Sequence, residues 1–461
     1  MPGVRCPRGA RPPWVRRRDN RRPMSAPHAP VPAPATSPPA SPLAEAARPW
    51  PTRCEVLVVG AGPAGSACAQ RLAAAGVDVV LVDQHNFPRD KICGDGLIPD
   101  AHAALRELGV YDELAALWQP AQHVRCVGSR AGHCDVPGTL SVLPRKVLDE
   151  VLVRAAVRAG ARLVTPLRFE TPLEDAQGRV AGARLRSGDA THEILANWVV
   201  LATGAVPQAL VAAGMCERHT PSGVALRTYV RHPGLAASIR QLHFVWHKRM
   251  RGGYGWIFPG PGGIFNIGAG HPGSHVKLKS GKGRMQELNL RHFFEAFCEV
   301  YEPARQLMAE GEKLGELKGA PLRCSLLGAR WTRRGMLVAG EAAGSTYAFS
   351  GEGIGKAMET GLLAAGALLA APRAAGETVP AGGADAEICQ LYEDGLRGLK
   401  PKFDLYERAS RVNQHPWLAD LVIWRANKSP RIMARMSAVI EERQNPGVLF
   451  SFRGIRKLLT E

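Results

Sequence analysis

The sequence predicts an α/β fold with a Rossmann-like domain, an inserted α+β domain and a helical C-terminal region. The apolar run CEVLVVG (54–60) ends on a glycine and is typical of a buried parallel strand. A helical stretch (66–76) and a second apolar run, VDVVLVD (77–83), complete a β–α–β unit of about thirty residues. Strand and helix patterns then mix through the middle of the chain, and helical patterns dominate from residue 385 onward.

The turn GAGPAG (60–65) has the glycine spacing of a dinucleotide site. Gly60 allows the tight turn, Gly62 lets the backbone approach a pyrophosphate, and Gly65 lets helix and strand pack closely. The following helix offers its N-terminus to the phosphates. Asp83 ends the second strand, where a carboxylate can bind a ribose hydroxyl. Strand, helix, second strand and acid together predict a bound dinucleotide; the alternative is a glycine-rich turn that binds nothing.

A second glycine-rich region, GEAAG (340–344) and then SGEGI (350–354), follows another predicted strand. The strand delivers Glu341 to a turn where its carboxylate can bind a polyol, and a helix begins directly afterwards. The N-terminus of that helix can stabilise a ring that gains negative charge, as a flavin does on reduction. A packing turn before an apolar helix is the alternative. Together with the first turn, this region favours FAD over NAD.

The other elements follow from local patterns of apolar residues, glycine and proline. Pro99 suits the first turn of a short helix. In chain order we predict a helix over 100–109, a helix over 144–160, a β-meander over 162–187, a buried strand over 198–204, a helix near 284–309, a strand before the turn at 340, and a long apolar helix over 353–371.

The formal net charge of +18 is concentrated at the two ends of the chain. Ten arginines against two acids give residues 1–53 a charge of +8, and thirteen basic against six acidic residues give 396–461 a charge of +7. The middle carries only +3. A nucleic-acid groove would place positive charge on the folded body, so no nucleic-acid partner is expected. The N-terminal stretch, rich in Pro, Ala and Arg, predicts a disordered basic tail.

The ten cysteines are scattered without a CxxC pair, so neither a metal site nor a disulfide framework is expected. A reducing cytoplasmic compartment is therefore the default. The longest apolar segment, TGLLAAGALLAA (360–371), is too short to span a bilayer. The Arg-rich start is not followed by an apolar core, so no signal peptide is expected.

Two further segments carry residues suited to chemistry. In FPRDKICGDGL (87–97), Cys93 follows two cations and precedes Gly-Asp-Gly, although a small buried thiol is the commonest fate of a free cysteine. In GYGWIFP (253–259), Tyr254, Trp256 and Phe258 alternate, so all three point to one face if the segment is a strand. Such a face can form a flat apolar wall, and ordinary core packing is the alternative.

These four segments resemble the geranylgeranyl reductase family of FAD-dependent oxidoreductases, within the p-hydroxybenzoate-hydroxylase-like flavoprotein group. The resemblance covers about residues 54–370, and PRDKICGDGL and YGWIFP are its most specific motifs. It implies an FAD-binding Rossmann-like domain whose cofactor contacts come from Gly60, Gly62, Gly65, Asp83, Arg89, Lys91, Arg145, Glu341, Gly351, Gly353 and Ile354. It also implies a catalytic loop of Cys93, Gly94 and Asp95, a substrate wall of Tyr254, Trp256 and Phe258, and no metal.

The resemblance further implies that hydride passes from reduced FAD to one carbon of a C=C bond in a polyprenyl, geranylgeranyl-type group, while a proton reaches the other carbon. An isolated alkene has no carbonyl to polarise, so positioning must supply most of the catalysis. Cys93 would donate the proton or shape the slot, with Arg89 and Lys91 tuning its pKa. Many relatives carry a G-A-D-G turn where this chain has LATG (201–204), which leaves the reductant open between NADPH and a ferredoxin-like donor.

Two other functions fit parts of the pattern. A flavin-dependent monooxygenase or halogenase acting on an aromatic substrate is one, because halogenases carry a G-W-x-W-x-I-P segment close to GYGWIFP. Tyr254 and Phe258 depart from that segment, and oxygen consumption would separate the two chemistries. The other is a non-catalytic FAD-binding redox protein, which would lack an apolar cavity beside the flavin.

The expected partner is an isoprenoid or prenyl-lipid substrate. HPWLADLVIW and PGVLFSFRGIRKLL, both within 396–461, mix apolar, Trp and basic residues, which suits either a membrane-facing surface or a solvated helical cap. The protein is expected in the cytoplasm, either free or peripheral at the inner face of a membrane. The predicted domains are a tail (1–52), a discontinuous FAD-binding domain (53–115, 141–205 and 331–372), a substrate domain (116–140 and 206–330) and a helical C-terminal region (385–461).

Overall fold

The computed structural model describes residues 50–130, 132–273, 275–277, 283–285, 288–371, 378–380 and 382–444. These residues belong to the compact unit formed by residues 49–461. The predicted basic tail lies outside the described residues except for its last three positions. The first strand begins at Arg53.

The first sheet is a Rossmann-type parallel core, as the sequence predicted. Its path runs β18-β19-β9-β1-β2-β6, and β1 pairs in parallel with β2 and β9. Val58 of β1 thereby lies between Leu81 and Val200. The strands are β1 Arg53–Val59, β2 Val79–Val82, β6 Arg162–Val164, β7 Arg168–Glu174, β8 Val180–Ser187, β9 Ala190–Leu201, β18 Thr332–Arg333 and β19 Met336–Val338.

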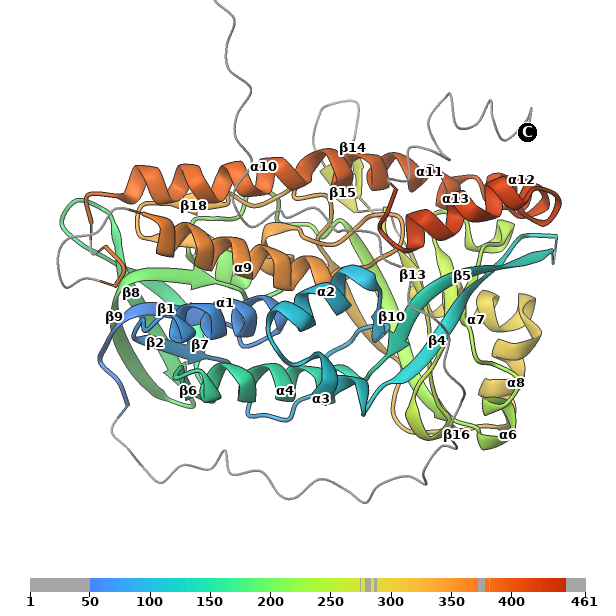
Figure 1. Ribbon diagram of the computed structural model, residues 1–461, viewed down its shortest axis with the longest axis horizontal. Coiled ribbons are helices and arrows are strands. Elements are labelled where there is room, and N and C mark those ends of the chain that lie inside the picture. The colour runs from blue at the N-terminus through green and yellow to red at the C-terminus, as the bar shows by residue number, and fades with distance from the viewer. Residues whose placement is uncertain are drawn as a thin grey trace, which may run out of the picture. The chain divides into compact units, whose positions relative to one another are not determined.

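The two faces of this parallel core are covered differently. Alternate residues of β1 separate them: Val56 and Val58 pack against α1 Pro63–Ala74 and α9 Ile354–Ala370, whereas Leu57 and Val59 pack against the β7–β8 hairpin. Because both faces are buried, these strands are continuously apolar rather than alternating. Figure 1 shows α10, α9 and α1 one below another beside the strands of this sheet.

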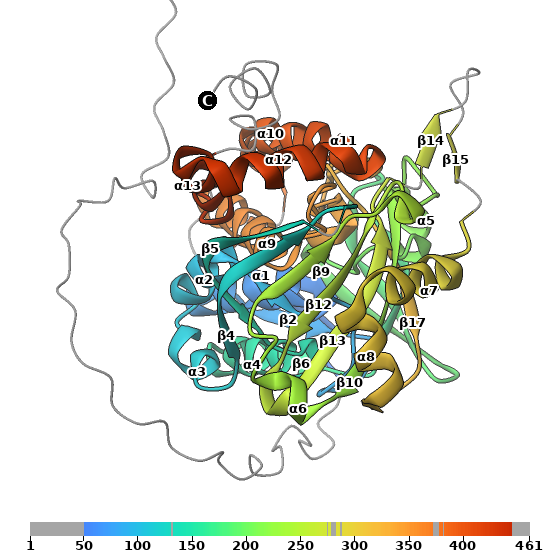
Figure 2. The same ribbon diagram turned by 90° about the vertical axis from the view of Figure 1, so that its right-hand side faces the viewer.

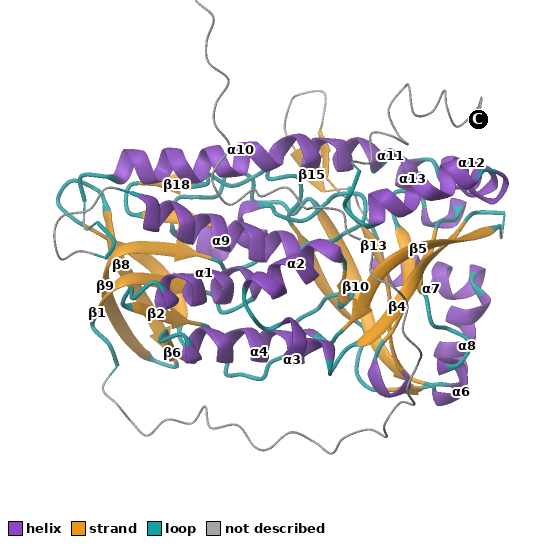
Figure 3. Cartoon of the chain, in the orientation of Figure 1, coloured by secondary structure: helices purple, strands orange, loops and turns teal. Residues whose placement is uncertain are grey.

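The second sheet forms the inserted domain and supplies the wall of the site. Its path is β16-β10-β13-β12-β11-β4-β5-β3, with β17 beside β10. Figure 3 shows β4, β5, β10 and β13 of this sheet. The strands are β3 Gly96–Leu97, β4 Gln119–Val127, β5 His133–Val142, β10 Gly223–Arg231, β11 Leu242–Val245, β12 Tyr254–Pro259, β13 Ile264–His271, β16 Glu312–Lys313 and β17 Lys318–Leu322. A separate pair, β14 His275–Lys277 and β15 Gly283–Met285, completes the strands.

The helices include a C-terminal group, as predicted. They are α2 Pro99–Glu107, α3 Tyr111–Ala115, α4 Arg145–Arg158, α5 Gln208–Ala212, α6 Pro233–Ala236, α7 Leu290–Val300, α8 Glu302–Glu310, α10 Asp385–Ala409, α11 Arg411–Gln414, α12 Pro416–Lys428 and α13 Pro430–Ile440. The segment 445–461, which includes all of PGVLFSFRGIRKLL, lies outside the described residues. None of the described helices has both the length and the apolar character that a bilayer crossing requires.

Two local predictions are corrected by the strand pairing. Residues 162–187 do not form one meander, because β6 pairs in parallel with β2 while β7 and β8 continue antiparallel to β9. The short β3, expected within the Rossmann-like domain, pairs with β5 in the second sheet. In both cases the partner strand is distant in sequence, so local patterns carry no signal for it.

Candidate active site

One cavity of about 650 Å³ runs from the first glycine-rich turn to the aromatic wall of β12. Every sequence-predicted site residue except Gly65 lines it. These residues are Gly60, Gly62, Asp83, Arg89, Lys91, Cys93, Gly94, Asp95, Arg145, Tyr254, Trp256, Phe258, Glu341, Gly351, Gly353 and Ile354. Nucleotide-side and apolar residues predicted from separate motifs therefore share one space.

The three glycines of the first turn have three different surroundings. A Cβ at Gly65 would lie 1.8 Å from the Gly60 carbonyl oxygen, which explains why Gly65 is packed rather than facing the cavity. Gly60 has a φ of +101° and no room beside the Ala202 carbonyl. At Gly62, in contrast, the nearest atoms to a Cβ are the guanidinium groups of Arg89 and Arg145, at 3.7 and 3.8 Å. The space over Gly62 is open and cationic, which fits an approaching pyrophosphate.

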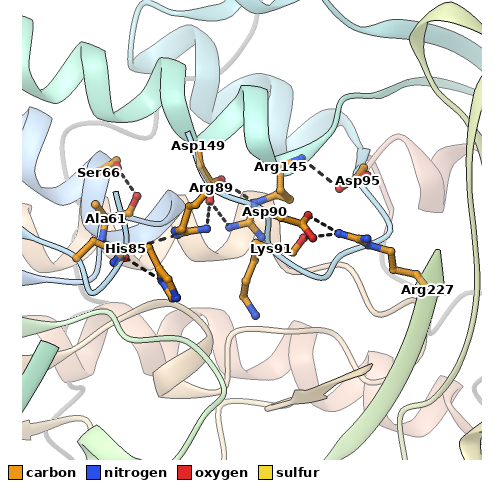
Figure 4. A network of polar contacts seen from close by, with 11 residues as sticks. Ala61, Ser66, His85, Arg89, Asp90, Lys91, Asp95, Arg145, Asp149 and Arg227 are labelled. Carbon is orange, nitrogen blue, oxygen red and sulfur yellow. Dashed lines mark hydrogen bonds and ion pairs between the residues drawn. The ribbon is translucent and has the colours of Figure 1, made fainter. Parts of the chain in front are cut away.

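Arg89 and Arg145 are held side by side by one buried carboxylate (Figure 4). Arg145 makes a two-point contact with Asp149 at 2.7 and 2.8 Å, and Arg89 Nη1 lies 3.0 Å from the same carboxylate. Asp149 is fully buried, so the group of three carries one net positive charge beside α1, whose N-terminus adds a partial positive charge. Asp149 was not predicted, since an acid at helical spacing from an arginine is also an ordinary surface pair.

Asp83 holds the turn as well as facing the cavity. Its carboxylate accepts hydrogen bonds from the backbone N–H groups of Ala61 (2.9 Å) and His85 (3.0 Å). Its role toward a ribose hydroxyl stays a prediction.

The loop 93–95 is tied down by a buried carboxylate. Asp95 is fully buried, with a φ of +66°, and accepts hydrogen bonds from the Tyr229 hydroxyl (2.5 Å), the Asn266 side-chain amide (2.8 Å) and the Arg145 backbone N–H (3.2 Å). Burial raises the pKa of Asp95 to about 6, and the hydrogen bond from Tyr229 opposes that rise. These contacts position the loop against the second sheet.

Asn266 joins the loop to the aromatic wall, and sequence reasoning missed it. Its amide donates to the Cys93 carbonyl (2.7 Å) as well as to Asp95, and its oxygen accepts from the Trp256 indole N–H (3.0 Å). The available signal was a polar residue within the otherwise apolar run IFNIGAG (264–270). A buried amide that satisfies three groups at once fixes their relative positions.

Cys93 is half-buried and reduced. Burial raises the pKa of the Cys93 thiol, and the neighbouring Arg145 partly offsets that rise. Arg145, rather than Arg89 or Lys91, is therefore the cation that acts on Cys93. A raised pKa favours the thiol over the thiolate that a nucleophilic cysteine requires.

Lys91 and Asp90 belong to a contact that crosses to the second sheet. Arg227, a buried residue of β10, contacts Asp90 at 2.5 Å and the Lys91 carbonyl at 3.3 Å. Figure 4 shows the Lys91 side chain extending away from Arg145. Arg227 thus fixes the start of the loop, while the Lys91 ammonium stays with the cavity lining.

The wall of β12 forms as predicted. Tyr254, Trp256 and Phe258 share one apolar cluster, whereas Ile257 between them packs on the opposite face. The Tyr254 hydroxyl donates to the Ser350 carbonyl (2.6 Å), which ties the wall to the SGEGI segment. Gly94 lies against the wall, because a Cβ there would be 3.1 Å from the Phe258 ring.

The far end of the cavity is lined by C-terminal helices, which the motifs did not reveal. Ala419, Val422 and Ile423 of α12 and Met436, Val439 and Ile440 of α13 complete an apolar slot opposite the aromatic wall. None of the charged residues that line the described cavity comes from these two helices. Such a slot suits a ligand with only apolar surface.

The SGEGI side of the cavity carries the predicted backbone geometry. Gly351 has a φ of +70°, a left-handed conformation, and α9 begins at Ile354 directly after Gly353. Burial and the neighbouring Asp100 raise the pKa of Glu352 to about 8. Glu341 accepts from the Thr346 hydroxyl at 3.2 Å and faces the cavity.

Replacing Tyr229 with phenylalanine is expected to make stability more sensitive to pH. The hydroxyl supports the ionised form of Asp95, so its loss raises the pKa of Asp95 above about 6. When folding raises the pKa of a carboxyl, the folded protein becomes less stable as pH rises from the ordinary pKa of 3.8 through the pKa of the folded state. The variant should be less stable by about 2 kcal/mol at neutral pH and by less at pH near 4. Denaturant unfolding at both pH values measures this, and an equal loss at both would contradict it.

Comparisons with known proteins show which proteins the chain is similar to. The FAD binding domain family matches residues 53–249. A menaquinone reductase from Mycolicibacterium smegmatis is 34% identical over 337 residues, covering 68% of this chain and 76% of the relative. A digeranylgeranylglycerophospholipid reductase from Methanosarcina mazei is 28% identical over 355 residues, covering 74% and 78%.

Solved structures share the fold. A geranylgeranyl bacteriochlorophyll reductase-like protein from Thermoplasma acidophilum superposes with a TM-score of 0.63 at 20% identity, covering 89% of this chain and 97% of that one. A flavin-dependent brominase superposes with a TM-score of 0.64 at 17% identity, covering 89% and 100%. At these identities the similarity shows a shared fold and does not show a shared reaction.

Proposed function

Because the chain belongs to the geranylgeranyl reductase family of FAD-dependent oxidoreductases, we propose that it reduces C=C bonds in the polyprenyl chain of a lipid. The relatives named above act, by their names, on menaquinone or on a digeranylgeranylglycerophospholipid. The proposal for this chain is a polyprenyl group of that kind.

The observation that carries the proposal is the continuity of the cavity. The cationic space over Gly62 and the apolar slot between β12 and α12–α13 belong to the same cavity of about 650 Å³. A dinucleotide anchored at the turn would extend toward the SGEGI segment, and a prenyl chain in the slot would meet it there. The slot offers no described cation or carboxylate from α12 or α13, which disfavours a polar ligand at that end.

The residues divide into binding, orienting and proton-holding groups. Arg89, Arg145 and the α1 N-terminus would hold the pyrophosphate of FAD. Bound FAD supplies the hydride-transfer chemistry. Asn266 keeps Trp256, Cys93 and Asp95 in a fixed arrangement, so that an unactivated alkene is positioned rather than polarised. The protonated Cys93 thiol is the candidate proton source beside the slot.

Replacing Cys93 tests whether its sulfur acts chemically. If the thiol donates the proton, Cys93→Ala should lower turnover at least about tenfold with little change in KM. Cys93→Ser, which keeps an O–H group of similar size, should retain more activity. Anaerobic turnover of a prenyl lipid with chemically reduced enzyme measures both variants. Equal turnover in wild type, Ala and Ser would remove any chemical role and leave Cys93 as a packing residue.

The electron donor is proposed at a coarser level. The LATG turn lacks the aspartate that many relatives carry, and NADPH and a ferredoxin-like protein are the two donors that we propose to test. Stopped-flow bleaching of the flavin absorbance with each donor would separate them.

The proposed function is tested by incubating the FAD-loaded enzyme without oxygen, with dithionite as reductant and prenylated quinone or geranylgeranylated lipid as substrate. Mass spectrometry should show a gain of two hydrogens per reduced double bond. Oxygen-dependent hydroxylation or halogenation of an aromatic substrate, without any mass gain in prenyl lipids, would overturn the proposal.

A further inference from the structure

We propose that the outer face of α12 is a docking surface for an anionic lipid bilayer. Trp417 and Trp424 are 60% and 49% exposed, more than any other large apolar side chain in the described part of the chain. They are seven residues apart, which is two helical turns, so they lie on the same face of α12. Buried aromatic residues are ordinary, whereas two exposed tryptophans on one helical face are not.

Basic side chains lie next to Trp424. The Lys428 ammonium lies 4.6 Å from the centre of the Trp424 ring, and the Arg425 guanidinium lies 5.2 Å from it. Over 416–440, four basic residues stand against the single acid Asp420, which gives the helix pair α12–α13 a charge of +3. Asp420 itself accepts a hydrogen bond from the Arg130 backbone, so part of its charge is directed to the turn between β4 and β5. Tryptophan with Lys and Arg is the combination that the bilayer interface favours.

The inner faces of the same two helices line the slot. Ala419, Val422 and Ile423 face the cavity from α12, one turn or less from the exposed tryptophans. The helices α12 and α13 pack against β5 of the second sheet, and Figure 2 shows them above the end of that strand. Docking through α12 would therefore bring the apolar slot next to the membrane. A prenyl chain could then pass from lipid to slot with little exposure of its apolar surface to water.

The exposed tryptophans and their basic neighbours support membrane docking whatever the substrate is. The delivery of a prenyl chain from the membrane to the slot rests on the proposed function. A second copy of the chain is the competing occupant of an exposed tryptophan face. Charge argues against it, because a symmetric pair would bring two +3 helix pairs together.

The test uses the full chain with vesicles of phosphatidylcholine alone or with added phosphatidylglycerol. We expect flotation with the anionic vesicles, reduced by high salt, and a blue shift of tryptophan emission on binding. The double variant Trp417→Ala/Trp424→Ala should bind at least roughly tenfold more weakly, while its circular dichroism stays unchanged. The matched control is Leu195→Ala/Val211→Ala, which removes two exposed aliphatic side chains from β9 and α5 and should bind like wild type.

Three results would overturn the proposal: no flotation of the wild type, equal flotation of the tryptophan variant, or a concentration-dependent dimer that the tryptophan variant abolishes. A failure of membrane docking is distinguished from a failure of the proposed function by an assay with a prenyl substrate dissolved in detergent, which needs no membrane. That reaction should persist in the tryptophan variant whether or not the vesicles bind.

Discussion

Replacing Gly62 with valine is expected to abolish FAD binding while leaving the apoprotein folded. The φ of Gly62 is −77° and its ψ is −172°, an extended conformation that valine adopts readily. A Cβ there meets only two guanidinium groups at 3.7 and 3.8 Å, so the free protein has room for it. The branched side chain would occupy the space in which the backbone approaches a pyrophosphate. We expect the Kd for FAD to rise by at least about 100-fold, a loss of roughly 3 kcal/mol.

Flavin fluorescence titration measures the Kd, and thermal unfolding of the apoprotein checks the fold. The contrasting variant is Gly65→Ala, whose Cβ would lie 1.8 Å from the Gly60 carbonyl oxygen. That variant should lose apoprotein stability as well as FAD binding, because the helix and strand cannot approach each other. A Gly62→Val protein that binds FAD like wild type would show that the pyrophosphate does not lie over this turn.

Replacing Asp95 with alanine should have the second large effect, on both stability and turnover. Three donors lose their acceptor in a fully buried place: the Tyr229 hydroxyl, the Asn266 amide and the Arg145 backbone N–H. Buried donors left without a partner cost about 1–3 kcal/mol each, so a loss of about 3 kcal/mol or more in unfolding free energy is expected. Because Asn266 also holds Trp256 and the Cys93 carbonyl, turnover should fall at least about tenfold.

Asp95→Asn is the matched control for this change. Asparagine tolerates the left-handed backbone at this position and keeps one carbonyl acceptor, so it should lose clearly less stability than alanine. Urea unfolding and anaerobic prenyl reduction give the two readouts. Equal losses in Ala and Asn would contradict this account, because they would show that neither the retained carbonyl acceptor nor the left-handed backbone distinguishes the two variants.

Much of the nucleotide side was predictable because its constraints are local. Gly65 is required because a Cβ there would collide with the Gly60 carbonyl, within the same turn. Gly60 is required because a Cβ there would collide with the Ala202 carbonyl, just after the neighbouring parallel strand. The single face of Tyr254, Trp256 and Phe258 follows from the two-residue period of a strand. The sequence could not show that Arg89 and Arg145 share Asp149, since Arg89 lies sixty residues before that carboxylate and such a distant pair has no local signature.

The part that escaped prediction is the part made by contacts between distant segments. Tyr229 and Asn266 reach Asp95 across 134 and 171 residues, through a sheet whose register no local pattern specifies. For the same reason residues 162–187 were expected to form one meander, although β6 pairs with β2, and no local pattern indicated that β3 pairs with β5. The C-terminal helices were expected to be helical, yet their place along the slot depends on which strands they cover.

The sequence by itself determined the Rossmann-type turn, the glycine geometry, the cysteine loop and the aromatic strand, because each is encoded by residue types at fixed short spacings. The tertiary structure alone decided that these segments enclose one cavity, that Asn266 couples loop to wall, and that α12 and α13 complete the slot. The physical reason is that hydrogen-bond partners and shared cavities arise from packing between segments, whose free energy is distributed over many long-range contacts rather than written in any one motif.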